Sequence, residues 1–189
     1  LSERQLYFDK SDNSINVLRS GNYLQEPAPF YAGVSNFNHI QDKPVYLNLK
    51  PQTGVLTILL ILDGVTYLPE TISGVLSGIV SKRVFGTQDM DISEQGTGDV
   101  PLLFTPSSYS PSIYIASHRL LGISNTQKCE LVFSNDTISS VKIDLTTELQ
   151  TFNNLTTNHT LCRVFYNDKR MEATIEVIDW EERDYEFDM

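Results

Sequence analysis

The sequence predicts a mainly β protein, built as a β-sandwich or as a jelly-roll-like barrel. Short apolar runs recur along the chain, and several of them alternate between apolar and polar residues. Turn-forming residues separate these runs at intervals of roughly 10 to 20 residues, a spacing typical of sandwiches and barrels. One stretch alone has the apolar spacing of a helix. We therefore expect a β-rich domain with one short helix and a β arm at the N-terminus.

The first segment has the pattern of a small hairpin. Residues 5–8 and 15–17 read as two strands, and the polar residues 10–14 between them favour a turn. The run "QEPAP" at residues 25–29 cannot supply ladder hydrogen bonds at its prolines, so we interpret it as a connector. Residues 1–29 then form either an arm that packs on a neighbouring subunit or the first hairpin of the same domain.

The next part contains the most apolar strand and the helix. Residues 55–62 predict a buried strand, and Asp63-Gly64 after them predicts a tight turn. A helix is predicted over about residues 69–84, because apolar side chains recur there every three or four residues. Gly74 and Gly78 argue against this helix, since glycine disfavours a helix interior. The apolar positions concerned are Ile72, Val75, Leu76, Ile79 and Val80.

The second half reads almost entirely as strands. The candidates are residues 113–116, 128–133, 141–145, 161–166 and 173–178. We therefore expect a β-rich domain over residues 30–178. Residues 179–189 form an acidic tail that carries Trp180, Tyr185 and Phe187. The tail is either solvated or docks its aromatic side chains on a partner.

Composition excludes some classes of partner. The formal net charge is −10 at pH 7, and the basic residues are scattered, so we expect no binding to nucleic acid. The longest apolar run is far too short to cross a bilayer, and we expect no membrane partner. No signal-like segment opens the chain. Because the sequence begins with Leu1, we expect a processed form, a polyprotein product or part of a longer protein.

No motif in the sequence predicts catalysis, so we expect a protein that is not an enzyme and that uses no metal or cofactor. The three histidines share no spacing, and a solvated loop is a better interpretation of the acidic residues 89–99 than a calcium site. Cys129 and Cys162 are expected to be reduced and buried. The alternative is a disulfide between them, which would need an oxidising compartment. Three glycosylation sequons indicate secretion only weakly.

Loop aromatic residues are candidates for ligand contacts. Most aromatic residues fall in alternating runs, where packing is the expected role. Tyr31, Phe37 and Tyr109 instead lie in segments rich in Pro, Asn and Ser. They are our candidates for binding a carbohydrate or a receptor.

The opening hairpin carries a family resemblance. Leu6-Tyr7-Phe8-Asp9 precedes a polar turn, an alternating strand follows over residues 15–18, and Gly21 and Tyr23 close the unit. In this order of residues, segment 5–23 resembles the β units of tail-fibre, baseplate and head-decoration proteins of tailed bacteriophages. The resemblance implies a virion structural protein whose arm joins a neighbour.

Two functions are therefore predicted. The first is a structural component of a viral particle, located in the virion, whose partners are other virion proteins or copies of itself. The alternative is an extracellular β-sandwich module that binds carbohydrate or a host receptor. The candidate partner contacts lie in the arm and the tail; they are Leu6, Tyr7, Phe8, Ile15, Val17, Leu18, Tyr23, Trp180, Tyr185 and Phe187.

Overall fold

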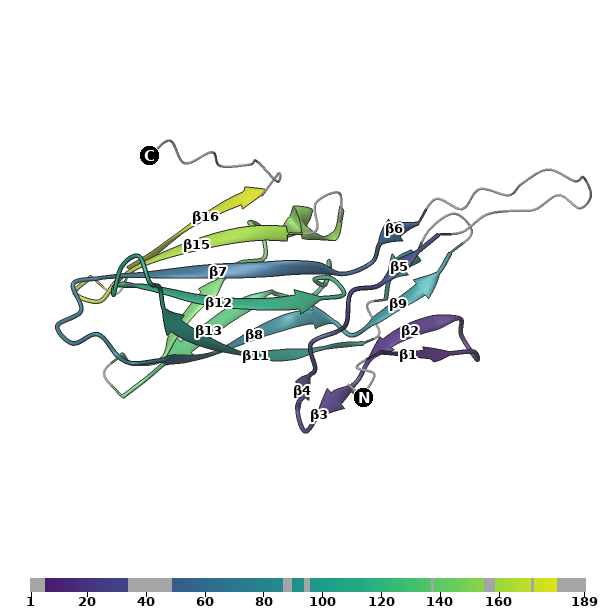
Figure 1. Cartoon of the computed structure of the whole chain (residues 1–189), viewed down its shortest axis with the longest axis horizontal. Helices are drawn as coiled ribbons and strands as arrows, with labels where there is room; N and C mark the ends of the chain where they lie inside the picture. The colour runs from purple at the N-terminus through teal and green to yellow at the C-terminus, as the bar shows by residue number, and fades with distance from the viewer. Residues whose placement is uncertain are drawn as a thin grey trace, which may run out of the picture.

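A computed structural model describes residues 6–33, 49–86, 90–93, 96–136, 138–154, 159–170 and 172–179. Within these ranges the chain forms β-strands and one short 3-10 helix (Figure 1). The elements are β1 (Leu6–Asp9), β2 (Ser14–Val17), β3 (Arg19–Ser20), β4 (Tyr23–Leu24), β5 (Tyr31–Ala32), β6 (Lys50–Pro51), β7 (Gly54–Asp63), β8 (Ile72–Val80), β9 (Lys82–Phe85), β10 (Met90–Ile92), β11 (Thr97–Pro106), β12 (Ile113–Leu120), β13 (Glu130–Ser134), β14 (Val141–Asp144), η1 (Gln150–Asn154), β15 (His159–Asn167) and β16 (Glu172–Asp179). The predicted fold class, mainly β and sandwich-like, is confirmed.

The long strands form one sheet that folds over on itself into two layers. Its order is β14-β13-β8-β11-β12-β7-β15-β16, so β11 and β12 meet at the fold. These two strands pair only at Thr105 with Ile115 and Pro106 with Tyr114. Both pairs lie next to the β11–β12 connection. From there the two layers, β14-β13-β8-β11 and β12-β7-β15-β16, separate towards the end of the molecule that is farther from this connection. The main core fills the space between them, because alternate residues of each strand point inward.

Residues 72–80, which were predicted as part of a helix, form a central strand instead. β8 pairs with β11 on one side and with β13 on the other. The apolar positions satisfy a strand period as well as a helix period, since Ile72, Leu76 and Val80 are all fully buried on even positions. A Cβ atom at position 74 would lie 2.9 Å from the ring of Phe104, and Gly78 has a φ of +72°. Gly74 leaves room for the ring of Phe104, and Gly78 adopts a backbone conformation that other residues rarely adopt. Both glycines therefore suit the strand, and the predicted helix was wrong.

The N-terminal hairpin belongs to the same folded body. β2 pairs with β9, which directly follows β8, in a small sheet of order β1-β2-β9-β10. Val17 and Leu24 are 6% and 3% exposed and lie in the main core. These contacts match an ordinary hairpin of the same domain, not an arm that packs elsewhere.

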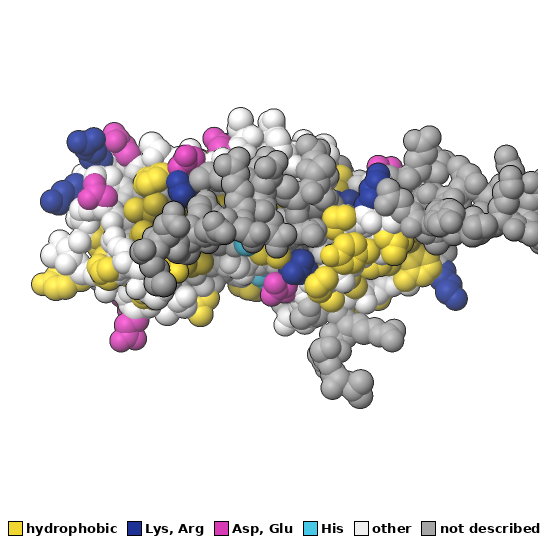
Figure 2. Space-filling view, turned by 45° about the horizontal axis from the view of Figure 1, so that its top comes forward, with side chains coloured by type: hydrophobic (Ala, Val, Ile, Leu, Met, Phe, Trp, Pro, Cys, Tyr) yellow, Lys and Arg dark blue, Asp and Glu magenta, His cyan; other side chains and the backbone are white. Residues whose placement is uncertain are grey.

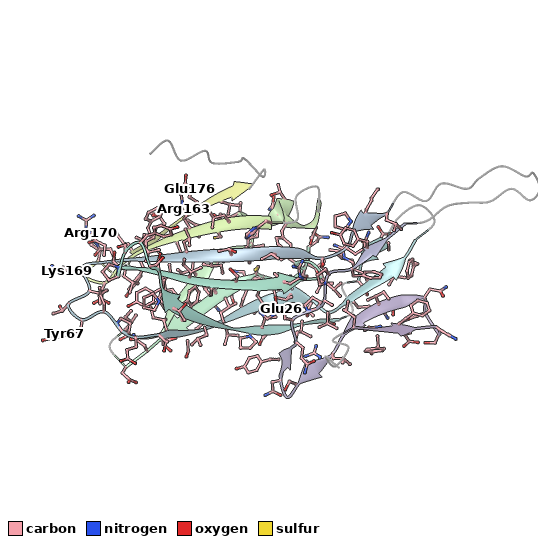
Figure 3. The ribbon with its side chains drawn as sticks, viewed as in Figure 1. Glu26, Tyr67, Arg163, Lys169, Arg170 and Glu176 are labelled. Carbon is pink, nitrogen blue, oxygen red and sulfur yellow. The ribbon has the colours of Figure 1, made fainter. Side chains whose placement is uncertain are left out.

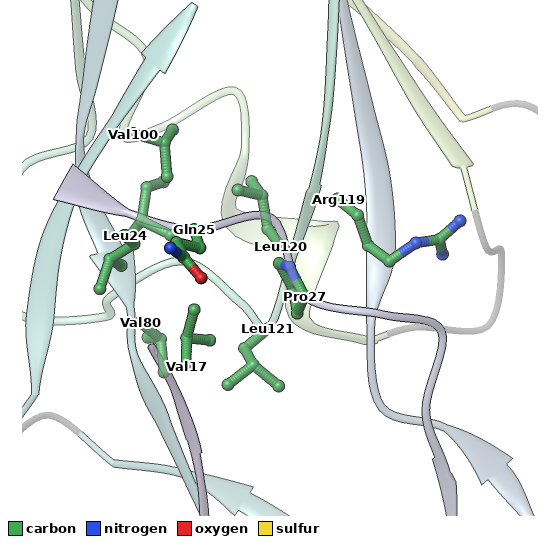
Figure 4. A pocket seen from close by; sticks show the side chains of 10 residues that line it. Val17, Leu24, Gln25, Pro27, Val80, Val100, Arg119, Leu120 and Leu121 are labelled. Atoms are coloured by element: carbon green, nitrogen blue, oxygen red, sulfur yellow. The ribbon is translucent and has the colours of Figure 1, made fainter. Parts of the chain in front are cut away.

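The segment after β2 covers the seam where the two layers separate. Tyr23 of β4 pairs in parallel with Asp99 of β11, and a carboxylate oxygen of Glu26 accepts the backbone N–H of Arg119 at 3.0 Å. The crevice between this segment and the sandwich is filled by side chains such as Leu24, Pro27 and Leu121 and leaves no room for a water molecule (Figure 4). Residues 17–27 thus complete the core between β11 and β12.

Candidate functional site

The two ends of the sandwich differ in construction. At one end lie the connections β7–β8, β11–β12, β13–β14 and β15–β16, which comprise residues 64–71, 107–112, 135–140 and 168–171 as far as they are described. We call this the loop end. The small sheet β1-β2-β9-β10 and the pair β5–β6 lie at the opposite end, which we call the small-sheet end (Figure 1). Binding residues are often carried on loops that a rigid sandwich holds in place.

The connections at the loop end are held by hydrogen bonds to the strands. The hydroxyl of Tyr114, a fully buried residue of β12, donates to the carbonyl of Pro69 at 2.6 Å. Asn167 donates its side-chain N–H to the carboxylate of Asp63 at 2.6 Å and accepts the backbone N–H of Arg170 at 3.0 Å. Gly64 has a φ of +74°, which a left-handed turn position favours for glycine. These hydrogen bonds hold the β7–β8 connection to β12 and the β15–β16 connection to the ends of β7 and β15.

Other side chains of these loops point outward. Tyr109 is 90% exposed and Tyr67 is 75% exposed, so neither contributes much buried area to the fold. Lys169 and Arg170 are also exposed, and neither forms an ion pair within the described part of the chain. Figure 3 shows Tyr67, Lys169 and Arg170 at the same end of the sandwich. Two tyrosines and two cations thus stand on fixed loops and are free to contact a ligand.

The small-sheet end carries a second, smaller apolar cluster. Ile15 and Ala32 form its buried centre, and Leu6, Phe30 and Phe85 pack against them. Phe8 contacts Phe85 edge to face, with ring centroids 5.9 Å apart. Hydrophobic side chains gather on the surface over this end (Figure 2). Exposed hydrophobic residues in the segments of this end are Tyr7, Phe8, Tyr31 and Leu49, which are 49%, 47%, 52% and 57% exposed.

A buried cation joins this cluster to the sandwich. Arg83 of β9 is 4% exposed. Its Nε donates to the carbonyl of Leu121 at 2.7 Å, and its guanidinium donates to the side-chain oxygen of Gln52 at 3.2 Å. A buried guanidinium needs such acceptors, because an unsatisfied buried charge is costly. Arg83 therefore connects β9 with the end of β12 and with the segment before β7.

The structure divides the predicted partner contacts into two groups. Ile15 and Val17 are buried within the chain's own cores, and Leu6 and Leu18 are half-buried. Tyr7, Phe8 and Tyr23 remain exposed. Trp180, Tyr185 and Phe187 lie outside the described residues.

The three predicted ligand aromatics do not form one site. Tyr31 is at the small-sheet end in β5, whereas Tyr109 is at the loop end, and the length of the sandwich separates them (Figure 1). Phe37 lies outside the described residues. Tyr67, Lys169 and Arg170 were not predicted as site residues from the sequence. The signals that could have identified them are the turn residues just before them, Asp63-Gly64 and Asn167-Asp168, which mark exposed loops.

Among the described residues, Thr57 brings two hydroxyls and a histidine together, since its hydroxyl is hydrogen-bonded to that of Ser117 at 2.8 Å and also to His159. No three His, Cys, Asp or Glu side chains gather within the described part of the chain in a way that could hold a metal ion. Cys129 and Cys162 are buried free thiols, and burial raises the pKa of each to about 12. His159 is hydrogen-bonded through Nε2 to the hydroxyl of Thr57 at 2.7 Å on the outer face of the sandwich. Within the described ranges, no helix is long and apolar enough to cross a membrane.

Comparison with solved structures finds the same fold in several bacterial proteins. No protein-family model and no curated protein matches the sequence. The structure is similar to the fimbrial anchor protein Mfa2 from Porphyromonas gingivalis, with a TM-score of 0.61 and 12% identity over 95% of this chain and 72% of that one. It is also similar to a "putative adhesin" from Bacteroides thetaiotaomicron, with a TM-score of 0.58 and 9% identity over 93% of this chain and 70% of that one.

A third similar structure is described as one of the "putative polysaccharide binding proteins" of Bacteroides thetaiotaomicron. Its TM-score is 0.53 and its identity 10%, over 89% of this chain and 66% of that one. The present chain spans slightly less than two thirds of this neighbour's length. At such low identities the likeness establishes the fold alone.

These neighbours correct the family resemblance drawn from the opening hairpin. Fimbrial anchor and adhesin-type proteins share the whole sandwich, whereas the phage resemblance rested on residues 5–23. A strand, a polar turn and a second strand recur in many β proteins, so this short unit did not identify a family. The resemblance to phage structural proteins was wrong, and so was the predicted role as a component of a virion.

Proposed function

We propose that this chain is an extracellular adhesion module that acts by binding a protein partner, not by catalysis. Its fold is shared with a fimbrial anchor protein and with an adhesin-type protein over more than nine tenths of the chain. The observation that carries the proposal is the loop end, where Tyr67 and Tyr109 are exposed on loops that hydrogen bonds hold. Tyr67 lies two residues before Pro69, whose carbonyl accepts from Tyr114, and the backbone N–H of Tyr109 donates to the hydroxyl of Ser107 at 3.1 Å. This corresponds to the alternative that the sequence analysis left open, with a protein as the target.

The chemistry of the loop end suits a protein contact. Tyrosine and arginine are enriched among the residues that dominate protein interfaces, because they offer large contact areas together with hydrogen-bond donors. Arg170 and Lys169 add positive charge to a chain whose net charge is −10. Glu70 and Asp136 are exposed at the same end, so a partner meets charges of both signs there, and the two tyrosines supply the main contact area.

An adhesion assay with paired variants tests the proposal. Beads that carry the purified chain would be counted on cultured epithelial monolayers. We expect the double variant Tyr67→Ala with Tyr109→Ala to lose at least tenfold in bead retention while its melting temperature stays unchanged, since exposed loop residues contribute little to stability. The matched control replaces Tyr7 and Tyr31, two half-exposed tyrosines of the small-sheet end, by Ala.

Treatment of the monolayer separates a protein target from a glycan target. Trypsin should abolish retention, whereas mild periodate oxidation of surface glycans should leave it intact. Retention that survives trypsin and disappears after periodate would replace the protein partner by a glycan. Equal loss in both tyrosine pairs, or loss only in the control pair, would show that the loop end is not the contact surface.

A further inference from the structure

A small pocket lies outside the loop end and outside the small sheets. It is formed where the segment after β12 meets the connection from β14 to β15, and its volume is about 270 Å³. This volume is close to the lower limit of small-molecule sites, which span roughly 300 to 1,000 Å³. The pocket therefore has room for one small ring and not for a long chain. It is lined by Ile123, Ser124, Asn125, Thr146, Leu149, Gln150 and Asn153.

The lining combines uncharged polar groups with an apolar floor. Three lining residues, Asn125, Gln150 and Asn153, carry side-chain amides, and Ser124 and Thr146 carry hydroxyls. Ile123 and Leu149 are 3% and 1% exposed and form the floor. Amides and hydroxyls both donate and accept hydrogen bonds, as the hydroxyl groups of a sugar do. None of the lining residues is charged.

The walls are preorganised by hydrogen bonds that hold the two segments together. The side-chain oxygen of Asn153 accepts the backbone N–H of Ile123 at 2.8 Å, and its amide donates to the carbonyl of the same residue at 2.7 Å. The hydroxyl of Ser124 accepts the backbone N–H of Gln127 at 2.8 Å and so fixes the turn. A Cβ atom at Gly122 would lie 2.8 Å from the Asn153 oxygen, so glycine allows this close contact.

One lining residue keeps an amide available for a ligand. The side chain of Gln150 is exposed and makes no hydrogen bond within the described residues. Its position in η1 places it at the rim, while the bonds of Asn153 stabilise the base. Gln150 is therefore the residue whose replacement changes the ligand contacts with the least effect on the fold.

The lining offers an anionic ligand no cation, because none of its residues is charged. The adjacent carboxylate of Asp144 accepts the backbone N–H of Thr146 at 3.0 Å and its hydroxyl at 2.5 Å. This carboxylate is exposed and paired with Lys128 at 3.2 Å, so it leaves little net charge beside the pocket. A neutral ligand therefore suits the lining better than a charged one.

We propose that this pocket binds a single neutral sugar unit. Its size, its uncharged polar lining and the exposed amide of Gln150 carry this inference, which is independent of the protein contact assigned to the loop end. The sugar lies against Ile123 and Leu149 and exchanges hydrogen bonds with the Gln150 amide. The chain then has two separate binding surfaces, one at the loops for a protein and one between β12 and η1 for a sugar.

Amide-resolved NMR titration of the whole chain tests the pocket. The probes are D-mannose, D-galactose and N-acetyl-D-glucosamine, each titrated to high millimolar concentration, with mannose phosphate as the anionic counterpart of mannose. We expect at least one neutral sugar to shift the resonances of residues 122–126 and 146–153 in a saturable way. Mannose phosphate should bind no more tightly than mannose, because no lining residue is charged.

Two substitutions of one exposed residue and a neighbouring control give the second readout. Gln150→Ala removes the amide and should weaken binding about threefold to tenfold, as expected for one lost hydrogen bond. Gln150→Glu keeps an acceptor for sugar hydroxyls and adds negative charge, so it should retain mannose binding and weaken the binding of mannose phosphate. Thr147→Ala, an exposed neighbour that does not line the pocket, should bind like the unchanged chain. Unsaturable shifts, shifts located elsewhere, or full affinity in Gln150→Ala would overturn the proposal and leave a pocket filled by water.

Discussion

The two ends of this sandwich carry exposed aromatic side chains for different reasons. At the small-sheet end Phe8 is about half exposed yet still contacts Phe85, and the cluster around Ile15 continues into the fold through Arg83. At the loop end Tyr67 and Tyr109 are largely exposed and belong to neither core cluster. Exposure of an aromatic residue is thus informative about function only when the residue has no packing role. By this criterion Tyr67 and Tyr109 are better candidates for recognition than Phe8, whereas Tyr7 and Tyr31, which also lie outside both core clusters, provide the comparison for the small-sheet end.

The largest expected effect on the free energy of unfolding concerns residues 17–27, the segment that covers the seam between β11 and β12. Leu24 lies 3% exposed between the layers, so Leu24→Ala should lower the free energy of unfolding by roughly 2 to 4 kcal/mol through a cavity between β4, β11 and β12. Denaturant unfolding followed by circular dichroism measures the loss. Tyr23→Ala, at the adjacent exposed position, should have a much smaller effect. If both variants unfolded at the same denaturant concentration as the unchanged chain, residues 17–27 would not complete the core.

A second comparison uses one arginine from each end. Arg83→Met keeps most of the side-chain volume but leaves the Leu121 carbonyl and the Gln52 side chain without this donor, which should cost about 2 to 3 kcal/mol. Hydrogen exchange should rise in β1, β2 and β9 before it rises in β7 or β8. Arg170→Met, on the exposed loop end, should leave the free energy of unfolding within about 0.5 kcal/mol of its original value. Equal effects of the two substitutions would contradict the structural role of Arg83.

The smallest expected effect is a change in how the melting temperature depends on pH under acidic conditions. The hydroxyl and backbone N–H of Thr146 hold the pKa of Asp144 at about 2 in the folded chain, below its ordinary value of 3.8. The unfolded chain therefore binds the proton more readily, and the stabilisation from Asp144 is present above pH 4 and is lost as the pH falls from about 4 to 2. Asp144→Asn should flatten the melting temperature over this interval relative to the unchanged chain. Asp136→Asn, at the loop end, provides the matched charge control; identical acid profiles for all three chains would refute the prediction.

Some of the fold could be predicted because the period of apolar residues is local information. The run at residues 55–62 became the long buried strand β7, and the apolar runs of the second half became β12, β13, β14, β15 and β16. Residues 69–84 could not be assigned in this way, because Ile72, Leu76 and Val80 fit both periods. Only pairing with β11 and β13 decided in favour of a strand, and that pairing joins residues far apart in the chain.

The residues of the candidate sites were predicted less completely than the strands of the fold. Tyr109 was identified because Pro and Ser around it indicate a loop. Tyr31 met the same criterion, but the register of β5 with β6 places it at the opposite end. The sugar pocket has no sequence signature, since Asn125 and Gln150 become neighbours only when the β12–β13 and β14–β15 connections pack together.

The sequence by itself determined that this protein is a β-rich domain with buried cysteines and an acidic surface, because alternation, turn residues and charge are properties of neighbouring residues. The tertiary structure decided where the opening hairpin packs, which aromatic side chains stay exposed, and which amides line a pocket. These outcomes depend on strand order and register. A strand that shifts its partner moves every side chain to a new neighbour, and short segments of sequence do not encode that choice.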